Sequence, residues 1–123
     1  MAGDPISQRE DFRDRIYAFT LKLINLLDHL PQENVSRRLG DQLLRSGTSV
    51  LGNYVEARSA SSRKDYTNYF TMSLKSANES KVWLSLLRDT GRLKAEETDW
   101  FIRELDELAN ILASSILTLK SRK

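Results

Sequence analysis

Four stretches of this chain carry apolar side chains at every third or fourth position, the spacing that gives a helix one apolar face. Residues that interrupt helices stand between the stretches: Pro31, a serine-rich segment around Ala60, and Gly91. No stretch alternates apolar and polar residues as a half-buried strand would. The sequence therefore predicts an all-α chain in which each helix buries one stripe. The four stripes start at Phe12, Leu39, Tyr66 and Phe101.

Capping residues indicate where the helices begin and end. Ser7 and Ser62 each stand three residues before an acidic residue, which is the spacing of a capping box. The second helix is expected to begin near Asn34 or Ser36, and Gly91 suits the left-handed position that follows a helix. The expected helices cover about residues 7–30, 34–58, 62–90 and 95–121.

Four helices of similar length joined by short turns favour one arrangement. Residues 1–123 contain no linker and no low-complexity tract, so we interpret the whole chain as a single domain. Short connections make consecutive helices antiparallel neighbours. The predicted fold is an all-α, antiparallel up-down-up-down four-helix bundle.

Composition argues against several classes of function. The chain has no cysteine for disulfides or thiolate metal sites, no signal-peptide pattern and no apolar run long enough to span a membrane. We therefore expect a cytoplasmic protein without membrane contact. The single histidine, His29, ends the first helix, where its charge would complement the helix dipole. We predict no catalytic residues, no metal site and no cofactor, and hence no enzyme.

Polar residues recur along one side of the second helix at spacings of seven, four and three. The third helix carries a Ser-x-x-Glu pair, and an arginine of the second helix can supply a positive charge to it. Glu56 facing Glu79 would resemble an acid/base pair, but rows of this kind usually serve hydrogen bonding between helices. We interpret the row as a polar seam that fixes helix register, with an exposed recognition surface as the alternative. The seam comprises Gln42, Arg45, Ser49, Asn53, Glu56, Ser76 and Glu79.

The third helix carries a second apolar stripe beside its main one. Met72, Trp83 and Leu86 repeat with helical spacing but point to a different side. Exposing all three would forgo about 1.5–3 kcal/mol of burial for each side chain. The stripe indicates either a wide core face or an interface between copies of the chain, and we predict that these residues lie at a subunit contact.

Charge is distributed unevenly, although the formal net charge is only +2. Residues 37–64 contain six basic and two acidic residues, whereas residues 96–107 contain six acidic residues and one basic residue. The basic segment favours contact with the phosphates of RNA or DNA, and the acidic one would suit a basic protein partner. The candidate nucleic-acid-binding residues are Arg37, Arg38, Arg58, Arg63 and Lys64.

The polar row and the residues after it resemble a known family. The pattern resembles the bacterial four-helix bundle proteins first noticed as products of intervening sequences within 23S ribosomal RNA genes. Two positions depart from it, because Ala57 and Lys75 stand where the family usually has glycine. The likeness spans essentially the whole chain and rests on Gln42, Leu43, Arg45, Ser49, Val50, Asn53, Glu56, Ser62, Asp65, Tyr66, Phe70, Ser76 and Glu79.

The resemblance implies a bundle that assembles into a homo-oligomeric ring, commonly a pentamer, and it does not imply an enzyme. The link to ribosomal RNA genes suggests RNA contact. A related group serves diversity-generating retroelements as an accessory that binds the reverse transcriptase and nucleic acid. The resemblance and the residues together favour a non-enzymatic oligomeric protein associated with nucleic acid. The alternative is a protein scaffold or adaptor with no nucleic-acid role.

Overall fold

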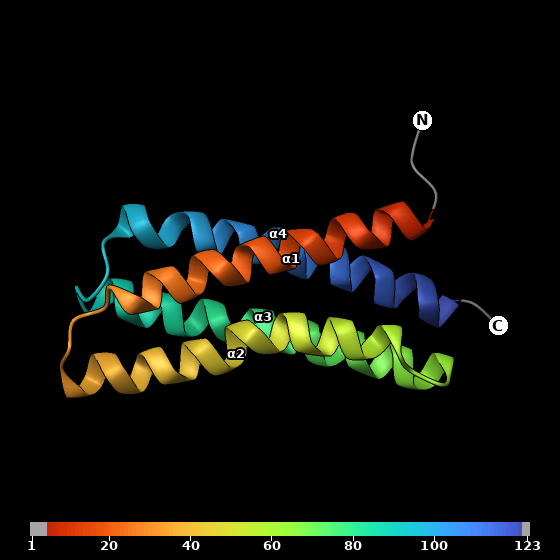
Figure 1. Ribbon diagram of the computed structural model, residues 1–123, viewed down its shortest axis with the longest axis horizontal. Coiled ribbons are helices and arrows are strands. Elements are labelled where there is room, and N and C mark those ends of the chain that lie inside the picture. The colour runs from red at the N-terminus through yellow and green to blue at the C-terminus, as the bar shows by residue number, and fades with distance from the viewer. Residues whose placement is uncertain (1–4, 122–123) are drawn as a thin grey trace.

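The computed structural model describes residues 5–121, and the side chains of residues 11–121. Within this range the chain forms four helices and no strands, which confirms the all-α expectation: α1 spans Pro5–Asp28, α2 Asn34–Arg58, α3 Arg63–Asp89 and α4 Ala95–Ser121. Consecutive helices run in opposite directions (Figure 1). The α1–α2 and α3–α4 connections lie together at one end, here named the Pro31 end. The α2–α3 connection lies at the other, the Ser61 end.

α1 differs most from its expected bounds. It begins at Pro5, two residues before Ser7, because proline fits the first helical position, where no backbone donor is needed. The predicted pairing of the Ser7 and Glu10 side chains lies outside the described side chains. At the other end the helix stops at Asp28, and the next two residues make tighter i to i−3 backbone bonds before Pro31.

The remaining helix ends combine expected and unexpected caps. Ser62 accepts a hydrogen bond from the backbone N–H of Asp65 at 3.1 Å, as the sequence predicts. Gly91 has a φ of +77°, the left-handed conformation that glycine adopts most easily. The cap of α2 is instead Glu33, whose Oε1 accepts from the N–H of Ser36 at 2.6 Å. A glutamate can act as a cap because its longer side chain curls back to the first turn.

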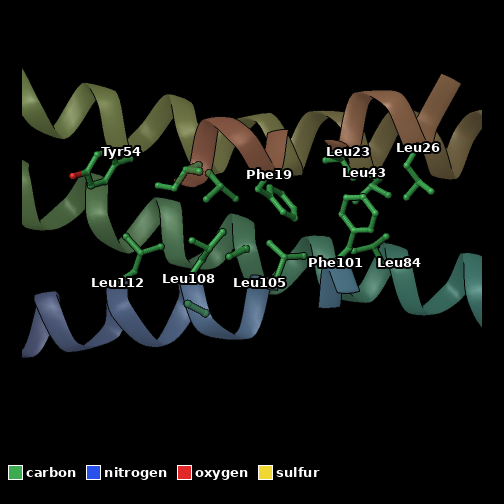
Figure 2. Packing of buried hydrophobic residues seen from close by; sticks show 14 of the residues in the cluster. Phe19, Leu23, Leu26, Leu43, Tyr54, Leu84, Phe101, Leu105, Leu108 and Leu112 are labelled. Atoms are coloured by element: carbon green, nitrogen blue, oxygen red, sulfur yellow. The ribbon is translucent and has the colours of Figure 1, made fainter. Parts of the chain in front are cut away.

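The apolar stripes meet in one continuous core (Figure 2). Phe19 packs edge-on against Phe101 with ring centroids 5.8 Å apart, and Tyr54 contacts the rings of Phe12 and Phe70 nearer the Ser61 end. Each large side chain removed from water contributes about 1.5–3 kcal/mol. The aliphatic side chains with no exposed surface are Ile16, Leu23, Leu43, Val50, Ala77, Leu84, Leu87, Leu105, Leu108 and Leu112.

The helices pack with unequal closeness. Among neighbouring helices, α2 and α3 make the most extensive contact, and α1 and α4 the least extensive. A shallow groove of about 460 Å³ remains between α1 and α4, lined by Leu21, Leu26, Trp100 and Phe101 among others. The ammonium group of Lys22 lies 4.4 Å from the ring centre of Trp100 beside this groove, a cation–π contact between the two helices.

Candidate binding surfaces

The polar row of α2 lies on the outer side of the α2–α3 contact. The Nη2 group of Arg45 donates to Oε1 of Gln42 at 2.9 Å and also to Oε2 of Glu79 on α3. The same Glu79 oxygen accepts from Nε1 of Trp83 at 3.0 Å. Among the described residues, this is the only hydrogen-bonded link that the predicted seam makes between the two helices.

The rest of the row faces outward. Ser49 donates to the backbone oxygen of Arg45 at 2.7 Å, and Asn53 donates to that of Ser49 at 2.9 Å, so both bond within their own helix. Glu56 is exposed and Ser76 is half-buried, and neither side chain has a hydrogen-bond partner in the described part of the chain. Because an exposed ion pair contributes about 0–1 kcal/mol, this row fixes helix register only weakly.

Buried serines supply the α2–α3 hydrogen bonds that the sequence did not reveal. The hydroxyls of Ser46 and Ser80 lie 2.8 Å apart, and Ser73 donates to the backbone oxygen of Val50 at 2.7 Å. All three serines are fully buried. Small side chains on the apolar stripes were the available signal, because serine and alanine at core positions let two backbones approach closely.

The second apolar stripe of α3 is exposed in part. Met72 and Leu86 each keep 41% of their surface exposed, whereas Trp83 is half-buried because it packs against the core. Val82, which the sequence reading omitted, is 54% exposed. We define the α3 face as Met72, Val82 and Leu86.

A larger apolar surface lies across α1 and α2. Tyr17, Leu21 and Ile24 follow one another at i, i+4 and i+7 on α1, and Leu44 and Val55 lie on one side of α2 with the partly buried Leu51 between them. A hollow that residues of both helices line lies at the Pro31 end of the α2 row, where Leu44 borders it. Sequence analysis missed this surface because it followed only the residues that repeat with the core stripe of each helix. The α1–α2 face comprises Tyr17, Leu21, Ile24, Leu44, Leu51 and Val55.

Acidic side chains of α4 are tied to neighbouring helices. Both carboxylate oxygens of Glu104 accept from Arg15 of α1 at 2.8 Å, and Glu107 accepts from the same guanidinium at 3.0 Å. The hydrogen bond to Glu104 raises the pKa of Arg15. Asp106 pairs with Lys81 of α3 at 2.7 Å. These three carboxylates are neutralised within the molecule, so the acidic segment offers a basic partner less charge than its sequence suggests.

The predicted basic residues separate into two groups at opposite ends of the bundle. Arg37 and Arg38, at the Pro31 end, donate to neutral acceptors, the backbone oxygen of Gln32 and Oδ1 of Asn34, each at 3.2 Å. The other group flanks the α2–α3 connection at the Ser61 end and is exposed: Arg58, Arg63 and Lys64. Lys120 of α4 is exposed at this end as well.

Acidic groups accompany the arginines at the Pro31 end. Glu33 accepts from Nε of Arg92 at 2.8 Å, and this bond, with the N–H of Ser36, lowers the pKa of Glu33 to about 2. Asp28 and Asp41 are exposed nearby. The Pro31 end therefore carries both signs of charge, whereas at the Ser61 end the exposed cations Arg58, Arg63, Lys64 and Lys120 outnumber the carboxylates of Asp11, Glu56 and Asp65.

Residues able to perform chemistry are sparse in the part of the chain that the structure describes. No group of three or more histidine, aspartate or glutamate side chains is placed to hold a metal ion there. Nδ1 of His29 donates to the backbone oxygen of Asn25 at 2.7 Å. Glu56 lies outside the cluster around Glu79, so the two glutamates do not form a pair.

None of the described helices combines the length and apolarity of a membrane span.

Comparison with known proteins identifies the family. The sequence profile of the 23S rRNA-intervening sequence protein family matches residues 10–114. One similar solved structure is a protein of unknown function from the S23 ribosomal protein family of Bacteroides thetaiotaomicron; it is 33% identical, with a TM-score of 0.79, and the match covers 85% of this chain and 97% of that one. No curated protein matches the sequence. Since the profile match covers most of the chain and the structural match agrees with it, this chain belongs to the 23S rRNA-intervening sequence protein family.

Proposed function

We propose that this protein is a non-enzymatic binding protein that assembles into a homo-oligomer and contacts nucleic acid through its Ser61 end. The observation that carries the proposal is that acidic and basic side chains differ in how far they form ion pairs within the molecule. Carboxylates of α4 are neutralised by Arg15 and Lys81. Arg58 and Lys64 have no ion pair within the described residues. Cationic side chains without a counter-charge are what phosphate groups bind.

The Ser61 end is the better of the two candidate ends. At the Pro31 end the positive charge of Arg37 and Arg38 is offset by Glu33, Asp28 and Asp41. At the Ser61 end the exposed cations Arg58, Arg63, Lys64 and Lys120 outnumber the carboxylates of Asp11, Glu56 and Asp65. The proposed contact is with the phosphate backbone and is insensitive to base sequence, because aromatic rings near this end, such as Tyr66, stack in the core.

Assembly strengthens a modest patch. A single chain presents only a few exposed cations at this end, whereas a ring of identical subunits repeats the patch around its axis and binds one polyanion at several points. The exposed apolar residues of the α1–α2 and α3 faces support assembly, because monomeric soluble proteins seldom expose such surfaces. A pentamer is the form that the family resemblance implies.

The same apolar faces favour a second candidate function, a scaffold or adaptor that binds another protein and no nucleic acid. In that case the partner, for example a reverse transcriptase, would occupy apolar surface, and the cations of the Ser61 end would serve solubility alone.

Titration with fluorescently labelled structured RNA and duplex DNA, at about 50 mM and about 200 mM salt, tests the proposal. We expect binding at low salt that falls steeply at high salt. Arg58→Ala/Lys64→Ala should weaken it at least severalfold, whereas Lys94→Ala/Arg103→Ala removes the same charge elsewhere and should change it much less. Equal losses in both double variants would place the contact elsewhere. No binding at low salt would leave the scaffold function.

A further inference from the structure

A hollow of about 270 Å³ lies at the Pro31 end, between the last turn of α1, the α1–α2 connection and the first turns of α2 (Figure 1). Its apolar wall consists of Leu27, Leu30, Pro31 and Leu44. Leu30 is buried, whereas Leu44 keeps 41% of its surface exposed at the rim. Pockets for drug-sized ligands enclose about 300–1,000 Å³. This hollow therefore suits a smaller molecule.

Two carboxylates without an ion pair in the described part of the chain border the hollow. Asp28 is the last residue of α1, and Asp41 lies on α2; both are exposed. Asp28 stands at the negative end of the helix dipole, where the last turn of α1 contains no basic residue. The one cation that lines the hollow is Arg37, whose Nη1 group donates to the backbone oxygen of Gln32 at 3.2 Å. The rim of the hollow therefore attracts a positively charged group.

A buried hydroxyl independently indicates a ligand that donates hydrogen bonds. Ser36 also lines the hollow and has no exposed surface, and its Oγ has no hydrogen-bond partner among the described residues. A buried polar atom left in this way costs free energy. Together with Arg92, the Ser36 hydroxyl lowers the pKa of Glu33, so the hydrogen end of the O–H dipole faces that carboxylate. The lone pairs of Oγ are then left for a donor.

We propose that the hollow binds a small primary aliphatic amine in its protonated form. The ammonium group has three N–H donors, which it directs to the carboxylates of Asp28 and Asp41 and to Oγ of Ser36. The hydrocarbon stem lies against Leu27 and Leu44. A metal ion fits less well, because no third acidic or histidine side chain joins the two carboxylates in the described part of the chain.

Saturation-transfer NMR tests the site, because it detects weak binding of small molecules to the full chain whatever its oligomeric state. Pentan-1-amine is titrated at about pH 7.5, where a primary alkylamine is protonated. We expect saturable binding, and pentan-1-ol, which has the same stem without the charge, should bind at least tenfold more weakly. Asp41→Asn and Ser36→Ala should each weaken amine binding at least severalfold. Asp11→Asn removes the same charge as Asp41→Asn at the Ser61 end and should leave amine binding unchanged.

Four outcomes would overturn the proposal. Equal binding of pentan-1-amine and pentan-1-ol would show that the apolar wall alone binds. Equal losses in Asp11→Asn and Asp41→Asn would show non-specific attraction to surface carboxylates. Tighter binding of Nα-acetyl-lysine methylamide than of pentan-1-amine would assign the hollow to a lysine side chain of a partner protein. No saturation transfer to pentan-1-amine would remove the site. None of these outcomes bears on the RNA and DNA titration, because the hollow lies at the opposite end of the bundle from the proposed nucleic-acid contact.

Discussion

At the scale of single residues, the Ser46–Ser80 pair carries more of the α2–α3 contact than the exposed polar row beside it. Both hydroxyls are fully buried and lie 2.8 Å apart, so removing one leaves the other with a weaker set of partners. Ser46 keeps only a long bond of 3.4 Å to the backbone oxygen of Leu43. We expect Ser80→Ala to lower the free energy of unfolding by about 1 kcal/mol, measured by urea denaturation.

Ser49→Ala is the control for that substitution, because its hydroxyl bonds only to the backbone of its own helix and is half exposed. We expect a change within about 0.5 kcal/mol. If Ser49→Ala destabilised the protein more than Ser80→Ala, the outer row and not the buried serines would hold the two helices together.

At the scale of one helix, α2 contains two glycines in opposite environments. Gly47 faces Leu23 of α1, and a methyl group there would collide with Cδ2 of that fully buried side chain. Gly52 is exposed, with nothing within 4 Å of the position that a Cβ would take. Gly52→Ala should therefore stabilise the protein by about 0.5–1 kcal/mol through helix propensity. Gly47→Ala should destabilise it, because overpacking costs about 1–3 kcal/mol and exceeds the same propensity gain.

Thermal and urea unfolding of the two glycine variants provide the measurement, and each variant serves as the control for the other. If both stabilised the protein equally, α1 would not pack on α2 as closely as the structure has it.

The same helices show what sequence reasoning can reach. Apolar spacing identifies the inward side of each helix, and local chemistry identifies Ser62 as a cap and Gly91 as a left-handed residue, because these signals lie within a few consecutive positions. The height of α3 against α2 depends on distant residues. The sequence predicted that both Ser76 and Glu79 would face the row on α2. In the structure only Glu79 reaches that row, and Ser80 lies opposite Ser46. Local patterns could not distinguish these two arrangements.

At the scale of the whole molecule, acidic side chains of α4 form ion pairs between helices, whereas exposed cations gather at the Ser61 end. Ion pairs join α4 to α1 and α3, and so use carboxylates where helices meet. Arg58 and Lys64, which have no ion pair among the described residues, lie at the Ser61 end. A sequence profile of charge shows a basic and an acidic segment of similar weight. Folding makes the two segments unequal, because ion pairs within the molecule neutralise most carboxylates of the acidic segment.

Assembly and nucleic-acid binding should therefore be coupled, and Val82→Glu tests the coupling. The exposed α3 face supports assembly, and a carboxylate at this position would be buried without a partner where a second copy covers that face, so we expect light scattering to report a monomer with unchanged helical content by circular dichroism. A monomer presents one Ser61 end where a ring presents several. Its affinity for structured RNA should fall at least tenfold, and the logarithm of its binding constant should depend less steeply on the logarithm of salt concentration. Asn110→Glu adds the same charge to an exposed position on α4 and should alter neither mass nor salt dependence. If Val82→Glu gave a monomer that bound RNA with the parental affinity and salt dependence, one Ser61 end would account for binding, and the ring would serve another purpose.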